Sequence, residues 1–274
     1  MPRPLLALGL LLSTLWMPGA LMNAAHAQPS DSVLAKVKAS GTLKVCYAQT
    51  TPDAYKDSKT GQWAGVFIDI TNELATWMKV KVEPVEVTFA TVILALNRGD
   101  CDLFGASLLY NAPRAMEVNY IIPFAAKGMN AVVAAGNPKK FAKPEDFNQD
   151  GVTLAAVAGS RDYEVAKRMF PKARLLALNP PTDIQLFDTV RRGDADAAFA
   201  NGITIRWWLK APGHEWAGIA FGDDFSTQPN GWAIRYGDPA WKDFLDSFAR
   251  FALANNRAKD LYESYLSRDS LVAK

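Results

Sequence analysis

Two polar residues, Ser107 and Asn201, stand where two buried strands are expected to end. Both side chains can form hydrogen bonds with a ligand. In open parallel sheets, ligands bind beyond the carboxyl ends of the strands. If each strand belongs to its own lobe and the lobes face each other, Ser107 and Asn201 meet across a binding cleft.

The two positions close a repeated segment of the chain. Residues 98–107, Arg-Gly-Asp-Cys-Asp-Leu-Phe-Gly-Ala-Ser, align with residues 192–201, Arg-Gly-Asp-Ala-Asp-Ala-Ala-Phe-Ala-Asn. Both copies indicate the end of a helix, a glycine stop, a small apolar strand and a polar residue. The repeat predicts two lobes built on one plan, with Asp102 and Asp196 as structural turn residues.

Histidine and cysteine chemistry finds little support in the sequence. Beyond residue 27 the sole histidine is His214, which follows Pro212-Gly213 and indicates an exposed loop instead of a metal site or a catalytic triad. An oxidising compartment would permit a bridge between Cys46 and Cys101. If their strands are parallel neighbours, however, about 10 Å separates them at about 3.3 Å per residue, which is beyond disulfide reach. The spacing favours unpaired cysteines, and we predict no metal and no cofactor.

Strands and helices are expected to alternate along the chain, as in α/β folds with parallel sheets. The apolar patterns indicate strands over residues 43–48, 80–87, 102–107, 152–157, 174–178 and 195–201. Helical spacing indicates helices over residues 68–78, 90–97, 162–169 and 182–192, the last with Thr182 as its cap.

Residues 1–27 have the pattern of a cleaved leader, with Arg3, an apolar run over residues 5–16 and Ala25-His26-Ala27 before the expected cut. No later stretch is apolar and long enough to span a bilayer. Without Arg3, the 30 basic and 28 acidic residues become 29 and 28, which gives no electrostatic footprint for nucleic acid or an anionic membrane. We therefore expect an exported protein that binds no nucleic acid. We also predict that it is periplasmic and a monomer.

Several short motifs follow one another in an order that is typical of one family. They are Gly-Thr-Leu-Lys-Val at 41–45, Gly-Gln-Trp-Ala-Gly-Val-Phe-Ile-Asp at 61–69, Pro113-Arg114, Tyr-Ile-Ile-Pro-Phe at 120–124 and Val-Ala-Gly-Ser at 157–160. From about Gly41 to Tyr265 the chain resembles the family 3 extracellular solute-binding proteins, the periplasmic receptors of polar amino-acid ABC importers. The resemblance implies the α/β, two-lobed type II periplasmic binding protein fold, with two open, mostly parallel sheets joined by two hinge strands. Lobe 1 would comprise residues 28–126 and 232–274, and lobe 2 residues 127–231.

The resemblance also implies a set of ligand-binding residues. Arg114 matches the arginine that grips the ligand carboxylate, for which a planar fork of donors is suited. Phe89 matches an aromatic residue that packs on the ligand side chain, and Ser107 matches a polar contact. Ser160 opens a helix whose free N–H groups favour an anion. Arg161, the next residue, stands where the family usually has a small hydroxyl, and it could bind a second acidic group or point into solvent.

Asn201 is the departure from the family pattern that bears most on the ligand. Amino-acid receptors of this family usually have an aspartate here that pairs with the ligand ammonium, and asparagine lacks the charge. Ala48 and Thr51 replace an acidic and an aromatic pocket residue, and Leu109 replaces a serine. We keep Thr51 and Asn201 as candidate ligand contacts, and we expect a carboxylate-bearing solute with a weakened preference for ordinary α-amino acids.

Three functions are compatible with this fold. The first, which we predict, is the substrate-binding component of an importer, which presents a small solute to a membrane permease and catalyses no reaction. The second is an accessory protein of a periplasmic quinoprotein alcohol (methanol) dehydrogenase, because relatives with that role have lost the amino-acid pocket. The third is an enzyme similar to cyclohexadienyl dehydratase, whose chemistry relies on an acid just after the strand of Asn201. Thr204 stands at that position and has no carboxylate.

Overall fold

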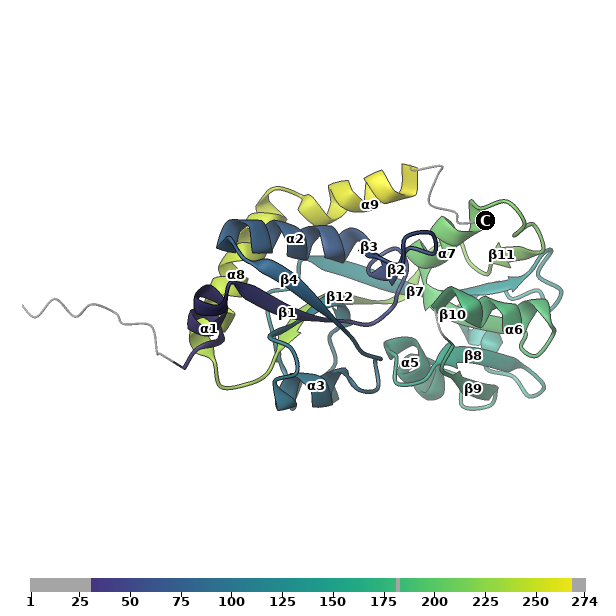
Figure 1. Ribbon diagram of the computed structural model, residues 1–274. Coiled ribbons are helices and arrows are strands. Elements are labelled where there is room, and N and C mark those ends of the chain that lie inside the picture. Colours follow the sequence, from purple (N-terminus) through teal and green to yellow (C-terminus); the bar gives the residue numbers. More distant parts are fainter. Residues whose placement is uncertain (1–30, 181–182, 268–274) are drawn as a thin grey trace, which may run out of the picture.

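The computed structural model describes residues 31–180 and 183–267 of the 274-residue chain (Figure 1). The expected leader over residues 1–27 and the expected helix cap Thr182 lie outside the described residues. Within the described ranges, no helix combines the length and the apolar character that a membrane crossing requires. The chain folds as an α/β protein of two lobes (Figure 1).

Lobe 1 contains a sheet with helices on both sides. Figure 1 shows α2 and α9 next to each other above this sheet and α3 below it. Tyr265 connects α9 to α2, because its hydroxyl donates to Asp69 Oδ2 at 3.0 Å and accepts from the Gly65 backbone N–H at 3.1 Å. The elements of lobe 1 are α1 (Val33–Ser40), β1 (Thr42–Tyr47), β2 (Tyr55–Lys56), β3 (Trp63–Ala64), α2 (Val66–Met78), β4 (Lys81–Glu86), α3 (Val92–Arg98), β5 (Leu103–Leu109), α4 (Ala112–Ala115), β6 (Asn119–Tyr120), α8 (Pro239–Ala254) and α9 (Arg257–Ser267).

Lobe 2 repeats the alternation of strands and helices on a smaller scale. Its elements are η1 (Pro144–Phe147), β8 (Thr153–Val157), α5 (Arg161–Met169), β9 (Arg174–Leu178), η2 (Asp183–Phe187), α6 (Asp188–Arg191), β10 (Ala197–Asn201), α7 (Gly202–Leu209) and β11 (Ala217–Ile219). The expected strands and helices of both lobes are present, with ends within two residues of the prediction, except for the helix over 182–192. That segment is the 3₁₀ turn η2 followed by one turn of α-helix in α6.

Two long strands, β7 (Ala125–Ala134) and β12 (Phe225–Ile234), cross between the lobes. They pair with each other in antiparallel register, with Gln228 opposite Lys127 and Asn230 opposite Ala125. The sheet order is β4-β1-β5-β12-β7-β10-β8-β9, so the two expected sheets are continuous through the crossing strands. The expected lobe boundaries, after residues 126 and 231, fall inside these strands, and they stay a prediction.

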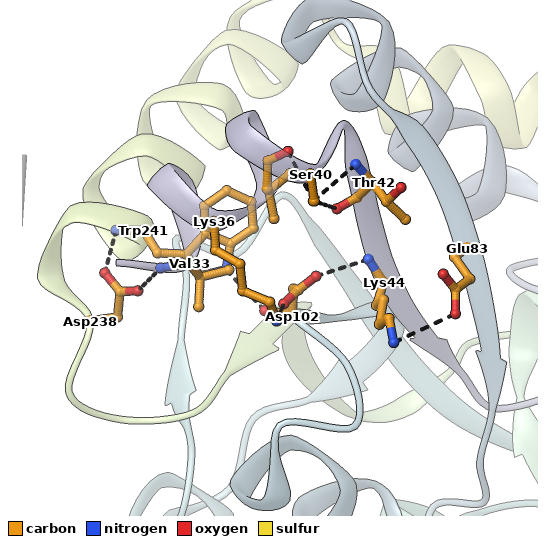
Figure 2. A network of polar contacts seen from close by, with 10 residues as sticks. Val33, Lys36, Ser40, Thr42, Lys44, Glu83, Asp102, Asp238 and Trp241 are labelled. Atoms are coloured by element: carbon orange, nitrogen blue, oxygen red, sulfur yellow. Dashed lines mark hydrogen bonds and ion pairs between the residues drawn. The ribbon is translucent and has the colours of Figure 1, made fainter. Parts of the chain in front are cut away.

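The repeat in the sequence corresponds to a repeat in the structure. Strands β4-β1-β5 of lobe 1 are parallel and are followed by the antiparallel β12, while β9-β8-β10 are parallel and are followed by the antiparallel β7. Asp102 exchanges two hydrogen bonds with Lys44, through its backbone N–H at 2.8 Å and its carboxylate at 2.9 Å (Figure 2). Asp196 makes the same exchange with Thr153, at 2.7 and 2.8 Å. Both aspartates are therefore structural turn residues.

The hydrophobic cores of the lobes are separate. Lobe 1 has one large cluster of buried side chains that includes Phe67, Trp232 and Trp241. Lobe 2 has two clusters, one around Phe147 and one around Phe187. Alternate residues of β7 point into the two clusters of lobe 2, as the period of a strand requires when both faces of the sheet are covered. Each lobe thus has its own core, and a few apolar side chains, such as Ile203 and Leu266, pack against the core of the other lobe.

The two cysteines form a disulfide, so the expectation of unpaired cysteines was wrong. Cys46 lies opposite Phe104 in the parallel pair of β1 and β5, three residues beyond Cys101. A separation of about 10 Å was expected because three residues of an extended strand span about that distance. Cys101, however, precedes β5, in the turn that leads from α3, and the Cα atoms are 5.6 Å apart. The bridge ties this turn to β1.

Candidate functional site

The ends of β5 and β10 and the first turn of α5 surround a cavity of about 40 Å³ between the lobes. Its volume admits a group the size of a carboxylate or a few water molecules, since one water needs roughly 10–15 Å³. The residues that line it are Thr50, Phe89, Ser107, Leu109, Arg114, Val157, Ser160, Arg161, Asp162, Phe199, Ala200 and Asn201.

Six of the seven residues predicted from the sequence line this one cavity: Phe89, Ser107, Arg114, Ser160, Arg161 and Asn201. Thr51 is not among the lining residues, and its neighbour Thr50 is. A tight turn explains this difference, because Thr50 and Ala54 bond each other's backbones at 2.8 Å and the chain reverses between them. The carbonyl of Thr51 accepts a hydrogen bond from the Thr204 hydroxyl of α7, so Thr51 joins lobe 1 to lobe 2.

Arg114 spans the cleft. It lies in α4, where Asn111 caps the helix by accepting from the Arg114 backbone N–H at 2.8 Å. Its guanidinium donates to the Leu109 carbonyl of its own lobe at 3.4 Å and to the Gly159 carbonyl of lobe 2 at 2.6 Å. The residue is 8% exposed, and this burial lowers the pKa of its guanidinium. The group stays charged because the ordinary pKa of arginine is very high. Arg114 therefore places a positive charge at the cavity and contacts both lobes.

Arg161 is the first residue of α5 and is 3% exposed. Its guanidinium donates to the Ser226 carbonyl at 2.7 Å and to Asn201 Oδ1 at 3.2 Å. Its Nε lies 2.7 Å from Asp162 Oδ1, as an ion pair whose angle does not make a hydrogen bond. All three partners of Arg161 belong to lobe 2 or to the lobe 2 end of β12, in contrast to those of Arg114.

The hydroxyl residues of the cavity are oriented by their neighbours. Asn230 of β12 is fully buried and its Nδ2 donates to Ser107 Oγ. Because the oxygen of Ser107 accepts this bond, the hydroxyl proton of Ser107 is left to donate elsewhere. Ser160 caps α5, and its Oγ accepts from the Tyr163 backbone N–H at 3.2 Å. Ser107 therefore adds a hydrogen-bond donor beside Arg114.

A second chamber of about 440 Å³ adjoins the first, and Phe89 and Val157 line both. Its other lining residues are Ala48, Gln49, Glu86, Val87, Thr88, Thr91, Ala158, Asn179 and Pro180. Glu86, the one ionisable residue among them, already binds Lys56 and Gln49, and these bonds lower its pKa. The outer chamber therefore suits an uncharged portion of a solute, and its volume is in the usual range for small-molecule sites.

Metal and histidine chemistry have no centre in the part of the chain that the structure describes. No group of three or more His, Cys, Asp or Glu side chains there could hold a metal ion. His214 was expected in an exposed loop, but it is half-buried because its ring stacks on Trp208 at 3.8 Å between centroids. Its Nδ1 lies 2.7 Å from the Trp208 carbonyl. His214 thus supports the packing of α7, and Trp207 and Trp208 are both buried.

Sequence reasoning missed two residues that shape the site. Asp162 lines the cavity and pairs with Arg161, yet an acidic residue in the first turn of a helix is a common stabilising feature and drew no attention. Asn230 orients Ser107 from 123 residues away in sequence. No local signal could have indicated this contact, because it depends on β12 lying beside β5.

The sequence profile of the bacterial extracellular solute-binding proteins, family 3, matches residues 43–268. The match covers nearly all of the chain after the expected leader. The chain belongs to this family.

Relatives of this family 3 solute-binding protein differ in activity. The cyclohexadienyl dehydratase of Pseudomonas aeruginosa is 26% identical over 190 residues, which cover 68% of this chain and 69% of that protein. A Sinorhizobium fredii protein named "probable amino-acid ABC transporter periplasmic-binding protein" is 26% identical over 172 residues, 61% of this chain and 57% of that one. The crystal structure of an ancestral amino acid-binding protein, a precursor of cyclohexadienyl dehydratase, superposes with a TM-score of 0.77 at 27% identity. It covers 86% of this chain and 100% of its own.

Proposed function

We propose that this family 3 protein is the periplasmic substrate-binding component of an ABC importer and closes its lobes on a small carboxylate-bearing solute. The observation that carries this proposal is the position of Arg114, buried at the cavity between the lobes with its guanidinium in contact with both. In this proposal a membrane permease receives the solute from the closed form. The chain needs no catalytic group for this activity, because no bond is made or broken.

The site residues then have the following roles. The bonds of Arg114 to the Leu109 and Gly159 carbonyls use two of its five N–H donors, so that others can bind a carboxylate. Ser107 donates its hydroxyl proton to the same carboxylate. Phe89 and Val157 flank the rest of the solute where it passes from the small cavity into the outer chamber. Gly159 completes the closed state, since its carbonyl accepts from Arg114 only when the lobes are together.

A panel of organic acids and amino acids, measured by thermal shift and calorimetry, tests the proposal. We expect at least one acid to stabilise the protein, and Arg114→Met to weaken its binding about 10- to 100-fold, the loss of a charge-assisted hydrogen bond in a buried site. Arg174→Met, at an exposed position of β9, is the matched control and should bind the acid as the wild type does. An absence of stabilisation by every compound would refute the proposal and favour the accessory role beside a periplasmic dehydrogenase.

The similarity to cyclohexadienyl dehydratase makes an enzymatic function the second candidate. Thr204, which stands at the expected position of the catalytic acid, is fully buried and its hydroxyl donates to the Thr51 carbonyl. A threonine in this bond cannot supply a general acid, which supports binding over catalysis. Conversion of prephenate by the purified protein would show that the enzymatic candidate is right.

A further inference from the structure

We infer that Arg161 determines the class of solute. Its buried positive charge lies beside Asn201, and it makes the site select 2-hydroxy or 2-oxo acids over the corresponding 2-amino acids. This inference rests on the proposed function and deepens it. Arg161 would recognise the substituent on carbon 2 of the solute, next to its carboxylate, whereas Arg114 would bind the carboxylate itself.

The first step is the arrangement of charge. Among the residues that line the cavity, the charged ones are Arg114, Arg161 and Asp162, so the lining has an excess of one positive charge. Asp162 is the sole carboxylate of this set, and it lies 2.7 Å from Arg161 Nε. A solute ammonium that bound this carboxylate would have to share it with Arg161 and would lie close to that cation. An anion meets no such obstacle.

The second step is the orientation of Asn201. Its Oδ1 accepts from Arg161 Nη2 at 3.2 Å, so the amide presents its Nδ2 donor group to other partners. A hydroxyl or keto oxygen on the solute can accept from Nδ2, but an ammonium has no lone pair to do so. An ammonium that bound Oδ1 instead would lie within about 6 Å of Arg161, given a hydrogen bond of about 2.9 Å. Two positive charges at that separation in a buried site repel each other.

The third step is rigidity. Arg161 connects three elements, because it begins α5 and bonds Asn201 at the end of β10 and Ser226 at the start of β12. These contacts are all on the lobe 2 side, so they do not require closure of the cleft. The guanidinium is therefore in place before a solute arrives, and its effect on selectivity is built into the open protein.

Matched acids that differ in one substituent test this inference. Calorimetry compares lactate with alanine, phenyllactate with phenylalanine, and 2-hydroxyglutarate with glutamate. We expect the wild type to bind the hydroxy acid more tightly than the amino acid by at least about tenfold in the pair that fits the outer chamber, since like charges at an interface are strongly disfavoured. Arg161→Met, which keeps the length and removes the charge, should reduce this ratio towards one. Arg161→Lys, which keeps the charge, should preserve the preference.

The double variant Arg161→Ala with Asn201→Asp adds the converse test, because it replaces the built-in cation by a free carboxylate. We expect it to prefer the amino acid. Thermal unfolding of each variant checks that lobe 2 still folds, and Arg161→Lys serves as the folded reference.

The outcomes separate this inference from the function on which it rests. If acids bind but the ratio is the same in wild type and Arg161→Met, Arg161 does not set the class of solute and the proposed function stands. If the wild type prefers amino acids, the inference is wrong, because the ammonium then binds in the cavity despite Arg161, for example at the Asp162 carboxylate. If no acid or amino acid of any pair binds to the wild type, both the inference and the proposed function fall.

Discussion

Lobe 1 and lobe 2 share the order of their strands and the bonding of their turns, but they differ in the side chains that they direct to the cleft. Asp102 and Asp196 make the same reciprocal bonds to the neighbouring strand. At the strand ends, Ser107 of lobe 1 is held by an amide, whereas Asn201 of lobe 2 is held by a buried cation. The repeat thus preserves the backbone and varies the chemistry.

The two buried arginines extend this contrast. Arg114 bonds carbonyls of both lobes, so part of its environment forms only when the cleft closes. Arg161 bonds the lobe 2 side alone. The contacts of Arg114 should therefore affect closure of the cleft, and the contacts of Arg161 should affect the selectivity of the site.

The largest effect is expected at a buried ion pair that belongs to neither lobe alone. Asp53 of the lobe 1 turn binds Lys127 of the crossing strand β7, and Tyr262 of α9 donates to the same carboxylate at 2.7 Å. Lys127→Met should lower the free energy of unfolding by about 3–5 kcal/mol, because it leaves a buried charge without its partner. Chemical denaturation measures the loss.

Two variants serve as controls for this prediction. Asp53→Asn with Lys127→Met should lose less than the sum of the single changes, because the charge is removed together with its partner. Lys259→Met breaks an exposed pair with Glu263 and should change stability by about 0.5 kcal/mol at most. Equal losses for Lys127 and Lys259 would contradict the role of the buried pair.

The disulfide distinguishes lobe 1 from lobe 2. It closes a loop with a sequence separation of 55 residues between Cys46 and Cys101. Replacement of both by alanine should cost about 2–4 kcal/mol of stability in lobe 1, because the bridge restricts the unfolded chain. Hydrogen exchange resolves the two lobes, and we expect faster exchange in β1 and β5 with β8 and β10 unchanged. Uniform acceleration in both lobes would mean that they unfold as one unit.

The turn aspartates provide the symmetric test. Asp102→Ala and Asp196→Ala each remove a carboxylate that accepts from the backbone of a neighbouring strand, and each should cost about 1–3 kcal/mol. Asp100→Ala and Asp194→Ala, at exposed positions of the same two segments, should stay within about 0.5 kcal/mol of the wild type. Thermal unfolding with a separate probe in each lobe measures these differences. A large cost in one lobe alone would show that the repeat is not equivalent in energy.

The smallest effect is expected at Gly159, where the lobes meet. Its φ is +71°, and an added Cβ would lie 3.4 Å from atoms of Ala90 in lobe 1. Gly159→Ala should cost about 1 kcal/mol for the left-handed backbone and should also weaken solute binding. Gly151→Ala is the matched control, with φ +78° and nothing within 4 Å of the added Cβ. Calorimetry should show weaker binding for Gly159→Ala alone.

Much of the fold and some of the site could be predicted from the sequence. The strand over 174–178 and the glycine stops at Gly99 and Gly193 follow from local preferences, since apolar periodicity and left-handed glycines act within a few residues. The alignment of residues 98–107 with 192–201 predicted the two strand ends that line the cavity. The roles of the lining residues stay predictions until a solute is measured.

Other features depended on contacts between distant segments. The disulfide was mispredicted because Cys101 lies in a turn whose path over β1 no local pattern specifies. The place of Thr51 next to α7 likewise depends on how the lobes meet.

The sequence by itself determined the elements, their repeat and the family, because local conformational preferences and residue order are enough for these. The tertiary structure alone decided which charges meet. Arg161 finds Asn201 and Ser226 at separations of 40 and 65 residues, and Asp53 finds Lys127 and Tyr262 at 74 and 209. A charge in a sequence can pair with many others, and only packing brings one partner within a few ångströms of it, where burial makes the interaction strong.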